Sequence, residues 1–512
     1  MNENLIYQLK NLLDIRIVKK NANNNLLLVD RGSIDPVIRS SLIAQIFNET
    51  QNLNIIVLST YKKTSWRHEV YKSFGIVSFI LSPRLKNFIL HPYLFLKSSF
   101  IFLIKYSQFC TKDFRWLIEN LKVSNIHIGD LIYDSYLRYN LKFLKPKKFD
   151  FRLIYLFILA VYKTIFIENI LEKNKVNQVI VSTATYINDS SIALRLATKK
   201  NIPSLFVFWF LLIFHNNYER SLQSRRKIFK RDIDNLQLPN NWIDEFEKYA
   251  TSRYSGRIEY QDFLNAYKNK VNLTKKDLFN QMGIGIEEYS HVVLIAPHAF
   301  SDASHESFDM IFDNYYEHFV ETLKHVKQSK KLNDTLWIVN PHPSSHVFKE
   351  EGIAKSFIDT LNCKNIILFP KHINAFSALR SADTIITCRG TIGLEFPACF
   401  GKKSIIAGEA PYSGFGFIEE PKNKVEYFKC LDNIKSISLM TDEEKQLAKK
   451  VFYFYECLQL ESYETTILPS NRFLNPNAFV ENILEKLKLK KFKEDEYYCK
   501  ARKSILNNIK ND

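Results

Sequence analysis

The alternation of apolar and amphipathic segments over residues 292–407 restricts the fold more than any other feature of the sequence. Apolar segments predict five strands, at 292–296, 336–340, 365–369, 384–388 and 403–407. Segments with helical spacing lie between them, at 309–327, 349–361, 374–382 and 391–400. Strands that alternate with helices form parallel sheets, so this region is expected to be Rossmann-like.

The first half follows the same pattern, with strands expected at 26–30, 54–59, 178–183 and 202–208. The predicted fold class is therefore α/β, with two Rossmann-like domains facing a central cleft, a helical insertion and C-terminal helices. The expected domains are 1–218 (Rossmann-like), 219–287 (helical connector), 288–460 (Rossmann-like) and 461–512 (C-terminal helices and a basic tail).

The charge of the chain favours anionic partners. Lys and Arg number 71 and Asp and Glu 54, for a net charge of +17. The basic stretches lack interleaved aromatic residues and any recognised DNA-binding motif, so nucleic acid is not an expected partner. The seven cysteines are scattered without a C-x-x-C pair, which argues against a zinc knuckle or redox pair.

Two apolar runs, 153–162 and 205–214, are ten residues long, and a spanning helix needs about 20. The N-terminus lacks the pattern of a secretory signal, so a cytoplasmic location is expected. Peripheral association with the inner membrane is a hypothesis for the run 205–214 or for the basic tail that begins at Lys486. The alternative for the tail is a solvated helix.

Ligands of open parallel sheets bind beyond the carboxyl ends of the strands, which selects a few loops. The loop 297–305 contains His298, Asp302 and His305. Asp302 is a candidate nucleophile or base, and the histidines are candidates to hold or protonate phosphate oxygens. The alternative is that Asp302 or Ser304 caps the next helix.

A second loop contains His342, Pro343 and Ser344. Prolines at 341 and 343 restrict the backbone around His342, which suits contact with a nucleotide phosphate. A structural turn with the histidine in solvent is the alternative.

A third loop runs directly into a helix and contains the candidates Arg389, Gly390, Thr391, Gly393 and Glu395. Amides at a helix N-terminus favour a phosphate, Arg389 can pair with a carboxylate or phosphate, and Glu395 can accept hydrogen bonds from a ribose. A capping interaction is the alternative for Glu395. In the first domain, Tyr186 follows a predicted strand and is a candidate for the cleft.

Other motifs give no support to other chemistries. The sequence has no P-loop, no G-x-G-x-x-G after a strand and no H-E-x-x-H, so ATPase, dehydrogenase and zinc-protease functions are not indicated. Asp232 and Asp234 form a D-x-D pattern, but no apolar strand precedes them. Neither a metal nor a cofactor is therefore expected.

The quoted loops resemble those of capsule and surface-polysaccharide biosynthesis proteins with a GT-B architecture, especially the retaining β-Kdo transferases that use CMP-Kdo. The matching pieces are residues 300–305, the His342-Pro343 dipeptide and residues 391–395; residues 129–138 are also similar. The resemblance implies that Asp302 is the nucleophile, that His342 and the helix start at Thr391 bind the CMP phosphate, and that Glu395 holds the ribose. It implies a nucleotide sugar as one partner, bound by the domain 288–460, and a lipid-linked or polysaccharide acceptor as the other, bound by the domain 1–218. It places the reaction in capsule or lipopolysaccharide synthesis.

Three alternatives stay open. One is a CDP-polyol phosphotransferase of the teichoic-acid type, and another is a transferase that uses a UDP- or GDP-hexose. The third is a non-catalytic subunit of polysaccharide assembly.

Overall fold

The computed structural model describes residues 1–13, 15, 24–61, 65–82, 91–139, 147–208, 211–222, 227–258, 260–285, 287–306, 310–457, 466–469 and 474–511. The chain divides into two compact units. Unit 1 contains Met1–Tyr136, Pro146–Ser224 and Glu461–Asp512, and unit 2 contains Leu137–Lys145 and Arg225–Leu460. Each unit has its own sheet and its own core, so each is described separately.

Unit 2 is built on a five-stranded parallel sheet with the order β11-β10-β9-β12-β13. Its strands are β9 (His291–Ile295), β10 (Thr335–Val339), β11 (Ile366–Leu368), β12 (Thr384–Thr387) and β13 (Ser404–Ile406). They are rich in Ile, Val and Leu and almost wholly buried, as expected for parallel strands with both faces covered. The strand order reverses direction between β9 and β12.

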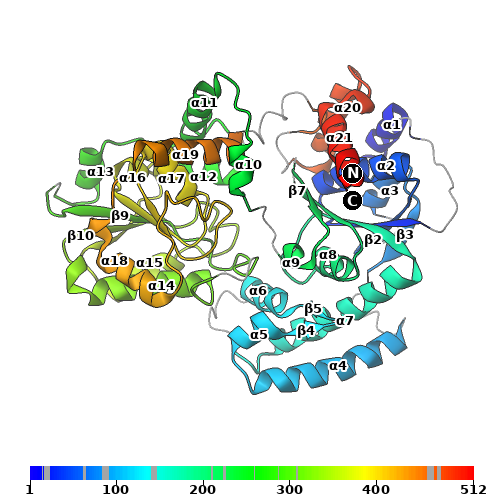
Figure 1. The fold of residues 1–512 in the computed structure, drawn as a ribbon, viewed down its shortest axis with the longest axis horizontal. Helices are drawn as coiled ribbons and strands as arrows, with labels where there is room; N and C mark the ends of the chain where they lie inside the picture. Colours follow the sequence, from blue (N-terminus) through cyan, green and yellow to red (C-terminus); the bar gives the residue numbers. More distant parts are fainter. Residues whose placement is uncertain are drawn as a thin grey trace. The chain divides into compact units, whose positions relative to one another are not determined.

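Helices cover both faces of this sheet (Figure 1). One face packs against α14 (Tyr315–Gln328), α15 (Ile353–Leu361) and α18 (Lys424–Asp432). The other packs against α13 (Lys275–Gln281), α16 (Ala375–Ser381) and α17 (Ile392–Phe400). Val293 and Leu294 of β9 belong to different cores, because successive side chains of a strand point to opposite faces.

The remaining helices of unit 2 include those of the expected connector. They are α10 (Lys230–Asp234), α11 (Trp242–Tyr254), α12 (Gln261–Tyr267) and α19 (Asp442–Phe452), with short 3₁₀ turns at Lys330–Leu332 and Ile434–Ser436 and a π-helix at Tyr453–Cys457. Phe246 of α11 packs with α19 residues, and Tyr267 of α12 packs with Ala375 of α16. From Arg225 onward the predicted connector is thus part of unit 2.

Unit 1 has a six-stranded sheet with the order β3-β2-β1-β6-β7-β8. Its strands are β1 (Asn25–Val29), β2 (Asn54–Ser59), β3 (Ser78–Leu81), β6 (Val176–Val181), β7 (Ser204–Phe208) and β8 (Leu211–His215). Neighbouring strands are parallel except β8, which runs antiparallel to β7. A small antiparallel pair, β4 (Lys122–Val123) and β5 (Ile126–His127), lies outside this sheet.

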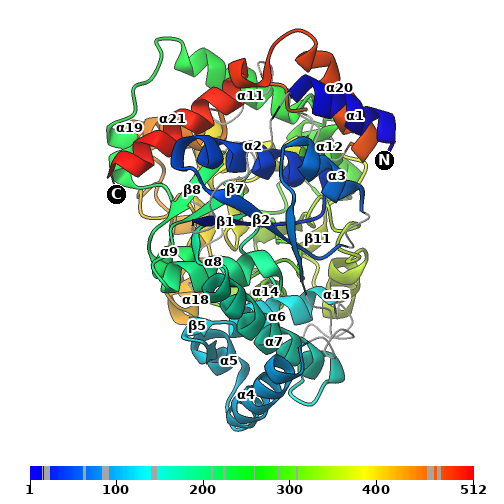
Figure 2. The ribbon, with the colours of Figure 1, turned by 90° about the vertical axis from the view of Figure 1, so that its right-hand side faces the viewer.

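The two faces of this sheet carry different sets of helices (Figure 2). One set contains α4 (Pro92–Cys110), α5 (Phe114–Asn120), α6 (Gly129–Tyr139), α7 (Phe151–Lys173) and α8 (Asp189–Lys199). The other contains α1 (Glu3–Leu13), α2 (Ile34–Gln51), α3 (Trp66–Ser73), α20 (Pro476–Leu487) and α21 (Glu496–Asn511). A short helix α9 (Tyr218–Ser221) and a 3₁₀ turn (Phe492–Glu494) complete the unit. The C-terminal segment thus returns to the core of unit 1.

The structure confirms the predicted fold class of two Rossmann-like α/β units, a helical insertion and C-terminal helices. It differs in some element limits. The helix expected at 309–327 begins at Tyr315, where the side chain of Asn314 caps it by accepting from the amide of Glu317 at 2.8 Å. The helix expected from residue 349 begins at Ile353.

Two segments that the sequence offered for membrane contact are engaged in the fold. The run 205–214 contributes to β7 and β8, and Leu205 and Val207 belong to the core. The basic tail forms α21, which buries Tyr497, Ala501 and Ile505.

Within the described residues, α7 is long and apolar enough to cross a membrane. Its apolar character extends well beyond the ten residues recognised in the sequence, to Phe151–Lys173. Two thirds of the most apolar part is buried inside the protein. The contacts of α7 in unit 1 are those of a core helix.

Candidate functional site

The predicted site residues of unit 2 follow the carboxyl ends of β9, β10 and β12: most lie in the loops after these strands, while Gly393 and Glu395 lie in α17. β9 and β12 are neighbours in the sheet and their following connections leave toward opposite sides. This point of reversal is where open α/β sheets bind ligands.

His298 links the loops after β9 and β12. Its Nε2 accepts from the backbone amide of Arg389 at 3.3 Å. This bond assigns the proton of the neutral ring to Nδ1. The ring also stacks on Tyr315 of α14, with 4.2 Å between the centroids and 11° between the planes. His298 is therefore held in one orientation at the switch point.

Asp302 lies beside the same group of residues. Its side chain is half-buried and accepts from the amide of Ala303 at 2.9 Å. Burial raises the pKa of Tyr315 well above its usual range. The charge of Arg389 opposes this increase, and the charges of Glu306 and Asp302 add to it. The structure thus gathers Asp302, Glu306 and Arg389 around Tyr315.

Glu350, which sequence reasoning missed, fixes the loop that carries Asp302. Its carboxylate accepts from the amides of Phe300 and Ser301, both at 2.7 Å, and from the hydroxyl of Ser301 at 2.6 Å. Glu350 is 4% exposed, and burial raises its pKa against the lowering effect of these hydrogen bonds. Nothing in the local sequence distinguishes Glu350 from Glu351. Only the tertiary structure shows that Glu350 is the one that contacts this loop.

His305 is buried in the loop that follows β9, and its role toward a phosphate stays a prediction. It is 4% exposed, and its Nδ1 lies 3.1 Å from the hydroxyl of Ser304. Neither Asp302 nor Ser304 caps α14, because Asn314 does so.

The loop after β10 is held by a helix of the expected connector. Ser344 is buried, donates to the carboxylate of Asp262 and accepts from the side-chain amide of Asn265 at 3.3 Å. The amide of Ser344 donates to Nδ1 of His342 at 3.2 Å, which assigns the ring proton to Nε2. His342 is thus oriented by its own loop, and Ser344 by α12.

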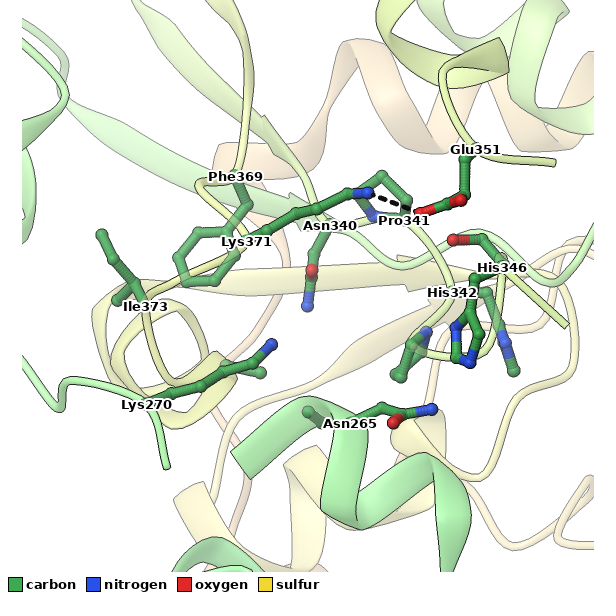
Figure 3. Close-up of a pocket in the computed structure, with 14 residues that line it drawn as sticks. Asn265, Lys270, Asn340, Pro341, His342, His346, Glu351, Phe369, Lys371 and Ile373 are labelled. Carbon is green, nitrogen blue, oxygen red and sulfur yellow. Dashed lines mark hydrogen bonds and ion pairs between the residues drawn. The ribbon is translucent and has the colours of Figure 1, made fainter. Parts of the chain in front are cut away.

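A pocket of about 260 Å³ opens beside this loop, at the carboxyl ends of β10 and β11 (Figure 3). It is lined by Asn265, Ala266, Lys270, Asn340, Pro341, His342, Pro343, Ser345, His346, Glu351, Phe369, Lys371, Ile373 and Ala375. Phe369, Ile373 and Ala375 are buried and give it an apolar floor. The predicted residues His342 and Pro343 are among its walls.

Two lysines, both missed in the sequence, add positive charge to the pocket. Burial lowers the pKa of Lys270, and the charge of Lys371 lowers it further. Lys371 forms an ion pair with Glu351 at 3.0 Å. An anion near Lys270 would relieve the repulsion between the two ammonium groups, so the pocket is suited to bind one.

Around the start of α17, space is restricted at two glycines. A Cβ on Gly390 would lie 2.9 Å from the Thr387 hydroxyl and 3.5 Å from Nε2 of His298. A Cβ on Gly393 would lie 2.3 Å from the Tyr412 hydroxyl. Gly393 is therefore closely packed between α17 and the sheet, and its contact with a ligand stays a prediction. Thr391 is half-buried and sits at the N-cap position without a side-chain cap. Arg389 is 2% exposed.

Glu395 is placed differently from the expectation. It is 1% exposed, its carboxylate pairs with Arg253 of α11, and it accepts from the Tyr267 hydroxyl at 3.4 Å. It therefore ties α17 to the helices of the connector, and it does not cap α17. Its role toward a ribose stays a prediction, and Arg253 was not recognised in the sequence because its partner is 142 residues away.

Tyr186 belongs to unit 1, in the loop after β6. Its φ of 62° is the left-handed region, which a bulky residue rarely adopts. The carbonyl of Tyr186 accepts from the Ser191 hydroxyl at 2.6 Å, which helps to hold this backbone. Its role in acceptor binding stays a prediction.

Within the described residues, no group of three or more His, Cys, Asp or Glu side chains is arranged to hold a metal ion. The polar side chains that line the pocket are Lys270 and Lys371, the acid Glu351, and amide, imidazole and hydroxyl groups that can donate hydrogen bonds. Such groups can bind and neutralise a phosphate ester.

The chain matches no protein-family model and no curated protein sequence. Among solved structures it is similar to UDP-GlcNAc 2-epimerase from Neisseria meningitidis bound to UDP-GlcNAc, with 12% identity, a TM-score of 0.25, and coverage of 91% of this chain and 100% of that chain. It is also similar to Thermosulfurimonas dismutans KpsC, a beta Kdo 2,4 transferase, with 14% identity, a TM-score of 0.33, and coverage of 54% and 79%. A third similarity is to the wall teichoic acid polymerase TagF, with 9% identity, a TM-score of 0.23 and coverage of 94% of both chains. Similarities of this size carry no argument about function.

Proposed function

We propose that this chain is a glycosyltransferase of bacterial surface-polysaccharide synthesis, in the capsule or lipopolysaccharide, and that it transfers Kdo from CMP-Kdo. The observation that carries the proposal is the pocket beside the His342-Pro343 loop, where Lys270, Lys371, His342 and His346 surround an apolar floor. The choice of CMP-Kdo comes from the resemblance of the three loops.

The lining of the pocket matches the parts of a nucleotide. Phe369 and Ile373 offer an apolar surface for a base, and Asn265 and Asn340 offer amides that can hydrogen-bond its edge. Lys270 and Nε2–H of His342 supply charge and a donor for the phosphate. These groups are also suited to stabilise CMP as it departs.

The proposed reaction retains the anomeric configuration through two displacements. One oxygen of Asp302 bonds to the anomeric carbon as the bond from that carbon to the phosphate oxygen breaks, and CMP leaves with the electron pair. The acceptor hydroxyl then displaces Asp302, and its proton passes to a base. Glu306 is the second carboxylate of the group around Tyr315 and is our candidate for that base.

The proposed acceptor is a lipid-linked or polysaccharide chain at the cytoplasmic face of the inner membrane. The proposal includes no metal and no cofactor besides the donor. A CDP-polyol or UDP-hexose donor would require the same phosphate-binding groups, so the donor must be tested directly.

The binding test is calorimetric titration of the purified protein with CMP, CDP, UDP and GDP. We expect CMP to bind, and Lys270→Ala to weaken it about tenfold through the loss of one charge-assisted contact. The matched control is Lys276→Ala, an exposed lysine of α13 outside the pocket lining. If no nucleotide binds, or if Lys276→Ala weakens binding as much as Lys270→Ala, the pocket assignment is wrong.

The activity test is the release of CMP from CMP-Kdo, with and without an acceptor extract. We expect Asp302→Asn to reduce release by roughly 10³-fold or more and to leave CMP binding intact. Release from CDP-glycerol or a UDP-hexose, but not from CMP-Kdo, would contradict the donor while keeping the transferase. Undiminished release by Asp302→Asn would contradict the nucleophile.

A further inference from the structure

Helix α4 of unit 1 is apolar on two opposite sides. Its inner side buries Leu94, Ser98 and Phe109, and it packs against α7. None of its 19 residues is acidic. On its outer side lies a row of exposed apolar residues, here called the α4 stripe: Tyr93, Leu96, Phe100, Leu103 and Ile104. Their spacing of three or four residues places them on one side of the helix.

The stripe is extensive and uncovered within the described part of the chain. Leu96, Phe100 and Leu103 are 66%, 67% and 63% exposed. Both ribbon views place α4 on the outer side of α7, away from the sheet of unit 1 (Figures 1 and 2). Single exposed apolar side chains are common on proteins, but a continuous row along a helix marks an interaction surface.

The start of α7 extends this apolar character. Phe149 and Phe151 are 78% and 90% exposed, and Tyr155 is 49% exposed. Two hydrogen bonds hold the preceding residue against the end of α4: the Tyr106 hydroxyl donates to the carbonyl of Lys148 at 2.6 Å, and Lys148 donates to the carbonyl of Cys110 at 3.2 Å. The aromatic side chains therefore adjoin the last turns of α4.

The charges around these residues are mostly positive. Lys97, Lys112 and Arg152 are exposed. The two acids near the end of α4 are engaged as helix caps: Asp113 accepts from the amide of Trp116 at 2.8 Å, and Asp150 from the amide of Arg152 at 2.7 Å. An apolar row with cations around it is complementary to a lipid surface with anionic headgroups.

We propose that the α4 stripe docks unit 1 onto an anionic lipid bilayer, with α4 lying in the interface and not crossing it. The whole-chain charge of +17 favours this occupant over a second copy, which would bring further positive charge to a surface already rich in cations. The surface differs from the segments that the sequence suggested: Leu205 and Val207 of the run 205–214 and Tyr497, Ala501 and Ile505 of the basic tail pack in the core. The inference is independent of the proposed donor and reaction.

The test is flotation of the full chain with vesicles of phosphatidylcholine containing about one third phosphatidylglycerol, against phosphatidylcholine alone. We expect binding to the anionic vesicles that weakens with salt. The triple variant Leu96→Ser, Phe100→Ser and Leu103→Ser should lower the partition coefficient at least about tenfold, because each replaced side chain contributes buried apolar area. These residues are exposed, so the variant should fold and bind nucleotide as the wild type does.

The matched control is Val425→Ser with Leu439→Ser and Leu489→Ser, which removes three apolar residues that are even more exposed, from other surfaces. It should bind vesicles as the wild type does. The proposal is overturned if the wild type does not float with anionic vesicles, or if the α4 variant floats as well as the control. It is also overturned if light scattering shows a lipid-free dimer that the α4 variant converts to a monomer, since the stripe would then join two copies.

Discussion

At the scale of single residues, burial decides the charge of several side chains in unit 2. His318 of α14 is 1% exposed, and its Nε2 lies 3.0 Å from the hydroxyl of Tyr427. That hydroxyl also lies 2.8 Å from the hydroxyl of Thr322. Burial lowers the pKa of His318 to about 3, so the imidazole is neutral in the folded protein at physiological pH.

This neutral histidine predicts a loss of stability in mild acid. A histidine in the unfolded chain has a pKa of about 6.5, so protons bind the unfolded state first as the pH falls. The contribution is complete above about pH 6.5 and decreases as the pH falls toward the folded pKa. Between about pH 7 and about pH 5 it amounts to about 2 kcal/mol in the free energy of unfolding.

Urea unfolding of the wild type and of His318→Gln at both pH values measures this contribution. The variant, which cannot titrate, should lose about 2 kcal/mol less than the wild type over the interval. Equal losses in the two proteins would show that His318 is not the responsible group. His127 and His291, whose pKa values burial also lowers, contribute to both proteins alike.

At the scale of elements, helix α17 contains a proline, and a neighbouring strand supplies the hydrogen bond that this proline cannot make. Pro397 lies inside this helix and has no amide hydrogen to donate to the carbonyl of Gly393. The hydroxyl of Ser404, at the start of β13, donates to that carbonyl at 2.6 Å instead. The strand thus replaces the hydrogen bond that the proline removes, next to the tightly packed Gly393.

We therefore predict that Ser404→Ala lowers the free energy of unfolding by about 1–3 kcal/mol, because it leaves a buried carbonyl without its donor. In the background of Pro397→Ala, which restores the backbone amide, the same change should cost less than half as much. A double-mutant cycle measured by chemical unfolding tests this coupling. Equal costs in both backgrounds would mean that Ser404 acts in another way.

At the scale of the whole molecule, the chain builds unit 1 from segments at both of its ends. Phe479, Val480 and Ile483 of α20 are buried in the same core as Leu9 and Leu13 of α1. The hydroxyl of Tyr498 in α21 donates to Glu49 of α2 at 2.8 Å. Unit 1 is therefore complete only when the C-terminal segment has been made.

This arrangement predicts that a defect in the C-terminal segment acts on unit 1. Phe479→Ala should cost about 3–5 kcal/mol, because it opens a cavity in that core. Hydrogen exchange should show lost protection in α1 and α2, and unchanged protection in β9 and β10 of unit 2. Leu489→Ala, an 88% exposed residue of the same segment, is the control and should change neither. Equal loss of protection in both units would contradict two separate cores.

Local pattern alone determined the class of fold. The five strands of unit 2 and four strands of unit 1 were found because parallel strands with two covered faces are continuous apolar runs. The edge strands β3 and β8 were not found; β3, at Ser78–Leu81, has no buried residue, and β8 is antiparallel to its neighbour. The loops after β9, β10 and β12 were found because topology places ligands there. His298, Asp302, His342 and Arg389 were recognised on this basis. Their sequence positions already showed that they follow strand ends.

Only the tertiary structure decided which side chains meet. Glu350 binds the loop that carries Asp302, and Lys270 lines the same pocket as His342. Arg253 pairs with Glu395. The partners in each case lie far apart in the sequence, so local patterns could not predict these contacts. The same holds for surfaces: the run 205–214 became strands in a core, while the outer side of α4 stayed exposed. Composition sets how apolar a segment is, but packing against the rest of the chain decides which of its faces is covered.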